Sequence, residues 1–121
     1  MTDAEDRRAR GERIFEEVNN FPAPVVTDPL TEATIDHVFA EIWARPGLSR
    51  KERRWIALSC VGASGSPIAM RAHVTSALQT GDLTIEELRE FVLQFAVYQG
   101  FPKATALYSV VEDVWAQMGD A

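Results

Sequence analysis

His73 is the side chain best suited to acid–base chemistry in this sequence. The chain holds two histidines, His37 and His73, and an imidazole exchanges a proton near neutral pH. His73 follows Met70 at helical spacing, on a side of its predicted helix that overlaps the edge of the apolar face. It therefore either acts on a ligand or makes a structural hydrogen bond at a helix edge. His37 falls opposite an apolar face and is expected on the surface or in an interface.

Two adjacent arginines, Arg53 and Arg54, are candidates for holding a carboxylate. The planar fork of a guanidinium binds both oxygens of a carboxylate at once. Both arginines lie in the basic run RKERR, one turn before a strongly apolar segment. Such a run is more often a solvated turn, so both interpretations stay open. Arg71, two residues before His73, is a weaker candidate.

Gln94, Tyr98 and Trp43 complete the set of candidate binding residues. Gln94 is the single polar residue in the run FVLQFAVY, and a buried amide needs hydrogen-bond partners. Those partners are a ligand, His73 or a backbone carbonyl. The rings of Tyr98 and Trp43 are suited to line a pocket, although packing in a core is the commoner role of such rings.

The rest of the sequence gives little support to other chemistries. Cys60 is the one cysteine, so an intramolecular disulfide, a CxxC redox pair and a cysteine-based zinc site are excluded. Cys60 lies in an apolar run and is expected to be an inert core residue. The two histidines form no HxH or HxxE pattern, and no glycine-rich phosphate motif is present. We therefore expect neither a metal site nor a bound cofactor.

The composition is that of a globular protein without a nucleic-acid or membrane partner. The chain has 121 residues, of which 46% are hydrophobic and 25% charged, which is sufficient for one packed domain. Its formal charge is −6, and the basic run RRAR lies among acidic residues, so nucleic-acid binding is not expected. The apolar runs are too short to span a membrane, and the first residues, MTDAEDRRARGER, do not resemble a signal peptide. These features predict a cytoplasmic protein.

Helical signals dominate the chain and predict an all-α fold of about six helices. Apolar residues recur at helical spacing, and no hairpin turn separates alternating runs. Four helix starts carry capping patterns, namely Asp28-Pro29, Ser49 with Glu52, Ser66-Pro67, and Thr84 with Glu87. Gly81 is expected to end a helix in the left-handed conformation. The predicted organisation is a single domain, 1–121, in which residues 1–28 form an N-terminal helix and a proline-containing linker.

The predicted helices differ in how much of their surface is apolar. The helix after Pro29 has its apolar residues at the α-helical positions i, i+3, i+4, i+7 and i+8, which are Ile35, Val38, Phe39, Ile42 and Trp43. The helices around 55–63 and 91–98 are apolar on nearly every side, which predicts burial on most sides. A single chain of this size cannot cover so much apolar helix, so part of it is expected to face another subunit.

Four stretches of the sequence resemble the carboxymuconolactone decarboxylases of the alkylhydroperoxidase D-like group. They are EIWARPGLSRKER (41–53), IALSCVGA (56–63), MRAHVTSALQTGDLTIEELRE (70–90) and FVLQFAVYQGFPKA (91–104). The WxRPGL and YxGFP patterns are the most specific parts, and the resemblance covers residues 36–118. It implies an all-α fold that assembles as homotrimers or homohexamers, with a site between helices near a subunit interface.

The resemblance also indicates which chemistry the chain lacks. The peroxidase branch of this group carries a Glu, a CxxC pair and a His, and these positions correspond here to Arg54, Ser66, Ala69 and His73. The histidine is retained, while both thiols and the acid are absent. Because a dithiol peroxidase needs an attacking and a resolving thiol, we expect no thiol peroxidase activity.

The decarboxylase branch supplies the functional hypothesis. It implies a cofactor-independent carbon–carbon lyase that acts on a small carboxylated lactone or a related ring acid, an anionic ligand. His73 is expected on the floor of a mostly apolar pocket as the proton donor, with Arg54 holding a carboxylate from the preceding helix. The residues expected to contact the substrate are Gln94, from the following helix, and Arg53, Tyr98 and Trp43.

The alternative hypothesis is a non-catalytic, oligomeric member of the group that binds a small ligand or serves as a scaffold. It is motivated by three departures from the usual decarboxylase pattern. Gln79-Thr80-Gly81 stands where the branch usually reads NNG, Gln94 stands in place of a histidine, and Thr105 stands in place of an asparagine.

Overall fold

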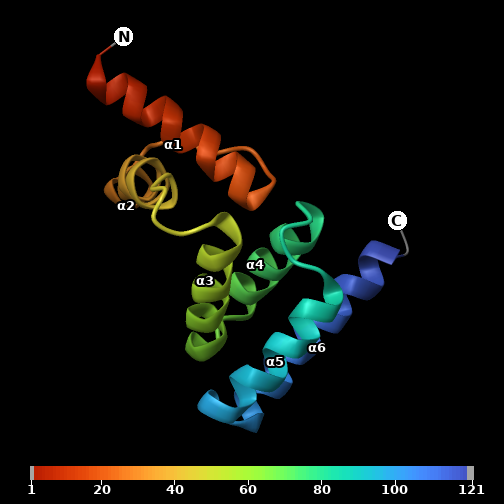
Figure 1. Cartoon of the computed structure of the whole chain (residues 1–121). Coiled ribbons are helices and arrows are strands. Elements are labelled where there is room, and N and C mark those ends of the chain that lie inside the picture. The colour runs from red at the N-terminus through yellow and green to blue at the C-terminus, as the bar shows by residue number, and fades with distance from the viewer. Residues whose placement is uncertain (1, 120–121) are drawn as a thin grey trace. The chain divides into compact units, whose positions relative to one another are not determined.

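The computed structural model describes residues 2–119, which form helices joined by loops (Figure 1). The helices are α1 (Asp3–Asn19), α2 (Pro29–Ala33), the π-helix η1 (Thr34–Trp43), α3 (Arg50–Ser64), α4 (Pro67–Gln79), α5 (Ile85–Gln99) and α6 (Phe101–Gly119). No strand occurs among residues 2–119, so the predicted all-α fold is confirmed. The chain divides into two compact units, Met1–Arg50 and Lys51–Ala121. This division falls in the first turn of α3.

The first unit is built on the contact between α1 and η1. Phe15 and Val18 of α1 pack against Ile35 and Phe39 of η1. The rings of Phe15 and Phe39 meet edge to face, with their centroids 5.0 Å apart. The N-terminal helix that the sequence predicts is therefore present as α1.

Segment η1 is a π-helix and not the α-helix that its apolar spacing predicts. In a π-helix the hydrogen bonds join residues five apart, so each turn holds more residues than an α-turn. Ile35, Phe39 and Ala40 are buried, while Val38 and Ile42 stay 37% and 40% exposed. The Nε of Arg10 in α1 donates to the carbonyl of Ala40 at 2.9 Å. This contact comes from another helix, so local periodicity does not reveal it.

Gly11 allows α1 to approach η1 closely. A Cβ atom at this position would lie 2.0 Å from the carbonyl oxygen of Ile35. A backbone oxygen cannot turn aside as the end of a flexible side chain can. Any side chain at position 11 would therefore push the two helices apart.

We predict that Gly11→Ala lowers the free energy of unfolding of the first unit by about 1–3 kcal/mol, the usual cost of overpacking. The loss is expected even though alanine is the better helix former. Urea unfolding followed by circular dichroism measures the change. Gly47→Ala is the matched control, because no atom lies within 4 Å of its Cβ position. A Gly11→Ala protein as stable as the native chain would contradict the close approach.

The second unit packs α4 and α5 against α6 around an apolar core. Leu58 of α3, Val74 of α4, Leu88 of α5 and Leu107 of α6 are all buried in this core. Helices α5 and α6 lie side by side in Figure 1, and Gly100 joins them with a positive φ of 95°. Helices α3 and α4 carry Arg54 and His73, on which the predicted acid–base chemistry depends.

Three of the predicted capping patterns, those at Asp28, Ser66 and Thr84, are confirmed. The side chains of Asp28 and Ser66 each accept a hydrogen bond from the backbone N–H three residues further on. Thr84 and Glu87 form a reciprocal capping box at the start of α5. Gly81 follows α4 with a φ of 78°, as expected for a left-handed helix end.

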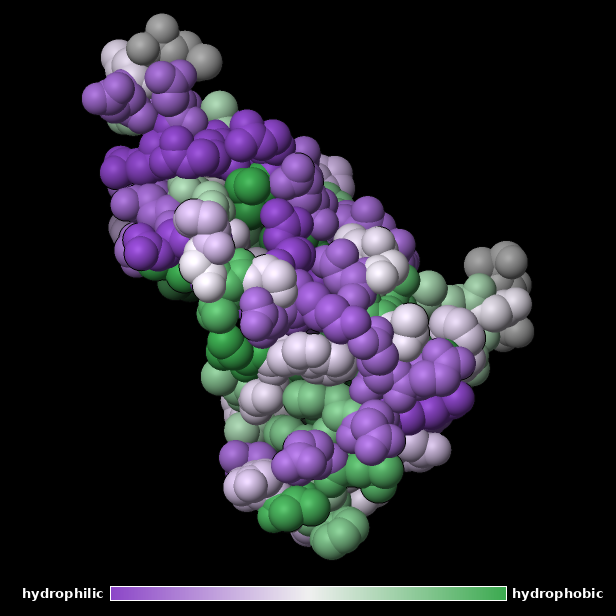
Figure 2. Space-filling view, viewed as in Figure 1, coloured by the Kyte–Doolittle hydropathy of each residue, from purple (hydrophilic) through white to green (hydrophobic). Residues whose placement is uncertain are grey.

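The two strongly apolar helices of the second unit are only partly covered by their own chain. Leu93, Val97 and Tyr98 of α5 are 64%, 75% and 80% exposed. Figure 2 shows apolar surface at the end of the unit where α5 turns into α6. On α3, Ile56 and Cys60 are also exposed. The predicted burial of these helices on most sides, and of Cys60 in the core, is therefore wrong for the single chain.

Candidate functional site

Arg54 is the centre of a polar cluster enclosed by α3, α4 and the turn after α4. Its side chain is only 2% exposed. Its Nε donates to Oδ2 of Asp82 at 2.7 Å, and its terminal nitrogens donate to the hydroxyls of Ser76 and Thr80 at 3.3 Å each. A buried charge requires such partners, because transferring it out of water unpaired is strongly unfavourable. The carboxylate that Arg54 holds in this structure therefore belongs to the chain itself.

His73 lies beside this cluster, one helical turn before Ser76. The Ser76 hydroxyl is within hydrogen-bond distance of the carbonyls of Ala72, at 3.0 Å, and His73, at 3.3 Å. The same hydroxyl accepts from Arg54. The guanidinium is thereby connected to the turn of α4 that carries the imidazole.

The surroundings of His73 favour its neutral form. The side chain is partly buried, and this burial lowers the pKa of His73 below its ordinary value. The positive charge of Arg54 lowers the pKa of His73 further, because it repels a second positive charge. At neutral pH the empty site therefore presents a neutral imidazole that can accept a proton or donate a hydrogen bond.

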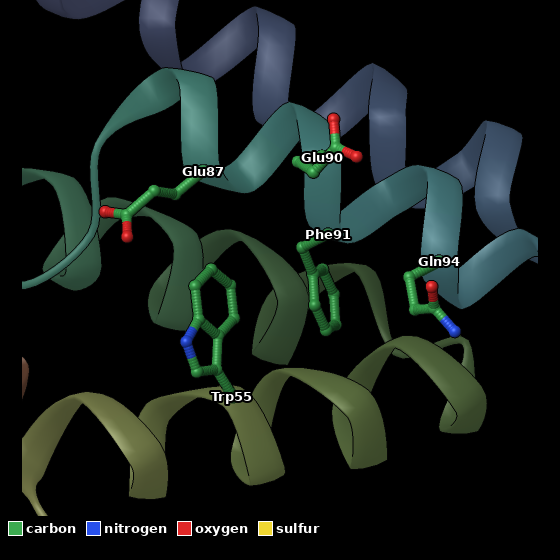
Figure 3. A pocket seen from close by; sticks show the side chains of 5 residues that line it. All are labelled: Trp55, Glu87, Glu90, Phe91 and Gln94. Atoms are coloured by element: carbon green, nitrogen blue, oxygen red, sulfur yellow. The ribbon is translucent and has the colours of Figure 1, made fainter.

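Gln94 lies in a different part of the second unit. It is exposed on α5 and lines a hollow of about 260 Å³ with Trp55, Phe91, Glu87 and Glu90. Figure 3 shows Trp55 rising from α3 and Phe91 descending from α5, and their stacked rings have centroids 5.2 Å apart. The prediction that Gln94 is a buried amide is wrong, because this side of α5 faces outward in the single chain. The structure places Gln94 beside an aromatic wall formed by Trp55 and Phe91.

The remaining predicted binding residues are also dispersed. Arg53 is partly buried on α3, next to Arg54 in sequence. Tyr98 is 80% exposed on α5. Trp43 belongs to the first unit, where its ring stacks on Phe39 with the centroids 5.8 Å apart, so its observed role is core packing.

Asp82 and Ser76 are members of the cluster that the sequence did not identify. Asp82 lies 28 residues after Arg54, and no short-range spacing rule connects two residues so far apart. Ser76 carried a usable signal, because it follows His73 by three residues and therefore shares its side of the helix. A serine buried on that side requires a partner.

Neither a metal-binding group nor a membrane-spanning helix is found in the part of the chain that the structure describes. Within residues 2–119, no group of three or more His, Cys, Asp or Glu side chains is arranged to hold a metal ion. No helix in the same range is both long enough and apolar enough to cross a membrane.

The lowered pKa of His73 predicts a pH-dependent stability. The unfolded chain binds a proton on this residue at a higher pH than the folded chain does. Acidification from about pH 7 to about pH 5.5 should therefore favour unfolding. We expect the free energy of unfolding to fall over this window, and the decrease to be smaller in His73→Gln. Urea unfolding at a series of pH values measures both.

His37→Gln is the control for this measurement, because it removes the other of the two histidines. It should retain the acid-induced loss of stability that His73→Gln reduces. Equal pH dependence in native protein and His73→Gln would show that the imidazole is not held in its neutral form.

Comparisons with known proteins point to one family. The model of the carboxymuconolactone decarboxylase family matches residues 28–113. A 4-carboxymuconolactone decarboxylase of Acinetobacter baylyi is 31% identical over 83 residues, which are 69% of this chain and 61% of the relative. A nitrosuccinic acid decarboxylase of Metarhizium robertsii is 31% identical over 94 residues, which are 78% of this chain and 65% of the relative. The chain thus spans less than two thirds of the length of either relative.

Proposed function

The chain belongs to the carboxymuconolactone decarboxylase family, and from this premise we propose that it is a carboxy-lyase acting on a small anionic acid with His73 as its acid–base group. The observation that carries the proposal is the placement of His73, which is partly buried yet open to solvent beside the cationic Arg54 cluster. An imidazole in such a place is suited to exchange a proton with a bound ligand.

The proposed reaction breaks the bond between a carboxylate carbon and its neighbour. Both electrons of that bond stay on the neighbouring carbon as CO2 leaves, and this carbon must then take up a proton. The imidazolium form of His73 supplies the proton, and the neutral imidazole regains one from solvent. An electron-withdrawing group next to the reacting carbon holds the electron pair in the meantime, which is why a carboxylated lactone is a suitable substrate and no cofactor is needed.

The charge of the substrate itself brings His73 into its reactive form. In the empty site, burial and Arg54 keep the pKa of His73 low. A substrate carboxylate next to the ring has the opposite charge and raises the pKa of His73, so the complex takes up a proton as it forms. Arg54 contributes through its charge, since its Nε already donates to Asp82 and its terminal nitrogens donate to the hydroxyls of Ser76 and Thr80.

Substrates related to those of the two relatives are the first to test. These relatives are named as decarboxylases of 4-carboxymuconolactone and of nitrosuccinic acid, both small organic acids. We propose a carboxylated lactone or a related ring acid as the substrate class of this chain.

His73→Gln should lower kcat for CO2 release by roughly 10²–10⁴-fold, the usual contribution of a general acid or base. Release of CO2 from 4-carboxymuconolactone and from nitrosuccinate is the measurement. His37→Gln is the control and should keep the native rate. Turnover that survives in His73→Gln would refute the assigned role.

A second candidate function is ligand binding without turnover by an oligomeric scaffold. The observation in its favour is that Arg54 already donates to Asp82, Ser76 and Thr80, while Gln94 lines a hollow beside Trp55 and Phe91. In that case calorimetry would detect binding of the same acids, tighter at lower pH, while no CO2 is released by either the native protein or the variants.

We propose further that the chain assembles with copies of itself, as a homotrimer or homohexamer. The exposed apolar side chains of α5 and of the turn into α6 support this, because Val97 and Phe101 are 75% and 73% exposed. Apolar surface of this kind is seldom left in water.

Val97→Glu should shift the assembly toward the monomer mass of 13.5 kDa, because it places a charge in the apolar surface that the neighbouring copy would cover. Light scattering at micromolar concentration measures the mass. Gln99→Glu is the matched control, since it adds the same charge at a nearby exposed polar position. A native chain that is already monomeric would rule out the assembly.

A further inference from the structure

We propose that Asp82 is a positioning residue of the His73 site: it holds the Arg54 guanidinium against α4 and balances the charge that the imidazole meets. This inference rests on the proposed acid–base role of His73 for its functional meaning. Its test, however, requires no turnover.

The geometry identifies Asp82 as the principal support of Arg54. The contact from Nε to the Asp82 carboxylate, at 2.7 Å, is shorter than the contacts to Ser76 and Thr80, at 3.3 Å each. Charge-assisted hydrogen bonds of this length are also the stronger kind. The two hydroxyls fix the orientation of the fork, while the carboxylate supplies the opposite charge.

The backbone around Asp82 is held in place by the same cluster. Its N–H lies 3.4 Å from the Thr80 hydroxyl, which in turn donates to the carbonyl of Ser76 at 2.7 Å. Gly81 precedes it with a positive φ of 78°, so the chain reverses at this point. Asp82 is 29% exposed and thus lies on the solvent side of the guanidinium.

The other charges around α4 are paired elsewhere. Arg71 of α4 binds Asp113 of α6, Arg89 of α5 binds Glu112 of α6, and Lys51 of α3 binds Glu87 of α5. Among the charged side chains of residues 51–119, Arg54 is the one whose charge lowers the pKa of His73. Asp82 therefore influences the imidazole through Arg54, as expected of a positioning residue.

This arrangement sets a compromise at the site. An Arg54 without its counter-ion would attract an anionic ligand more strongly but would also repel the proton that His73 must carry. A fully neutralised Arg54 would do neither. The partly exposed Asp82 carboxylate keeps the positive charge in place while reducing its field.

The test is an NMR titration of the His73 ring in the full chain, with His37 as a reference signal in the same sample. Asp82→Asn keeps an oxygen that can accept from Arg54 but removes the negative charge. We expect the pKa of His73 to fall by about 0.5, since a nearby charge commonly shifts a pKa by this amount or more. Asp113→Asn is the matched control. It removes the partner of Arg71, which lies on α4 like His73, and should leave the His73 titration unchanged.

A double-mutant cycle then tests the route of the effect. In an Arg54→Gln background, whose fold is checked by circular dichroism, Asp82→Asn should lower the pKa of His73 by less than it does in the native chain, because the part of the effect that acts through the position of Arg54 is lost. An unchanged or raised pKa in Asp82→Asn alone, a shift of the same size in Asp113→Asn, or a shift of undiminished size without Arg54 would each overturn the proposal. Because the readout is protonation, a chain that binds acids without decarboxylating them would still give the expected result.

Discussion

A positive charge taken out of water constrains how α3 and α4 pack together in the second unit. Arg54 is 2% exposed, and a guanidinium at such depth must find its hydrogen-bond partners inside the chain. Those partners come from α4 and from the turn that follows it. The relative placement of α3 and α4 is therefore fixed by a polar contact as well as by apolar packing. His73 occupies the turn of α4 that this contact holds.

The position of the cluster relative to the apolar core explains how Arg54 can be held rigidly while His73 stays accessible from solvent. The buried residues of α3 to α6, such as Leu58 and Leu107, enclose the unit from within. Asp82 and His73 lie where this core gives way to solvent, and both are partly exposed. A ligand can therefore reach the imidazole while Arg54 itself stays covered.

The positions at which the thiol-dependent branch of this group carries its cysteines have a different role here, because Ser66 caps α4 by accepting from the N–H of Ala69.

The parts of the structure that could be predicted from sequence are those determined by nearby residues. Helix type and the caps at Ser66 and Thr84 follow from local hydrogen bonding and spacing, and these predictions are confirmed. The π-helical winding of η1 could not be predicted, because it accompanies a contact with α1 that only Gly11 permits. Periodicity identifies apolar helix faces but not whether the covering surface belongs to the same chain, which is why Gln94 and Cys60 were expected to be buried. The same limit applies to the site: His73 and Arg54 could be singled out by residue type, whereas their connection through Asp82 and Ser76 depends on the tertiary fold.

The exposed thiol of Cys60 has a practical consequence. It is the one cysteine of the chain and it lies on α3, the helix that carries Arg54. A maleimide-linked fluorophore or spin label can therefore be attached at a single known place without altering the sequence. From there it would report on movements of α3 when an acid binds, and two labelled copies in one assembly would give a distance between equivalent helices. The same thiol requires a reductant during purification, because exposed cysteines of neighbouring molecules can be oxidised to a disulfide.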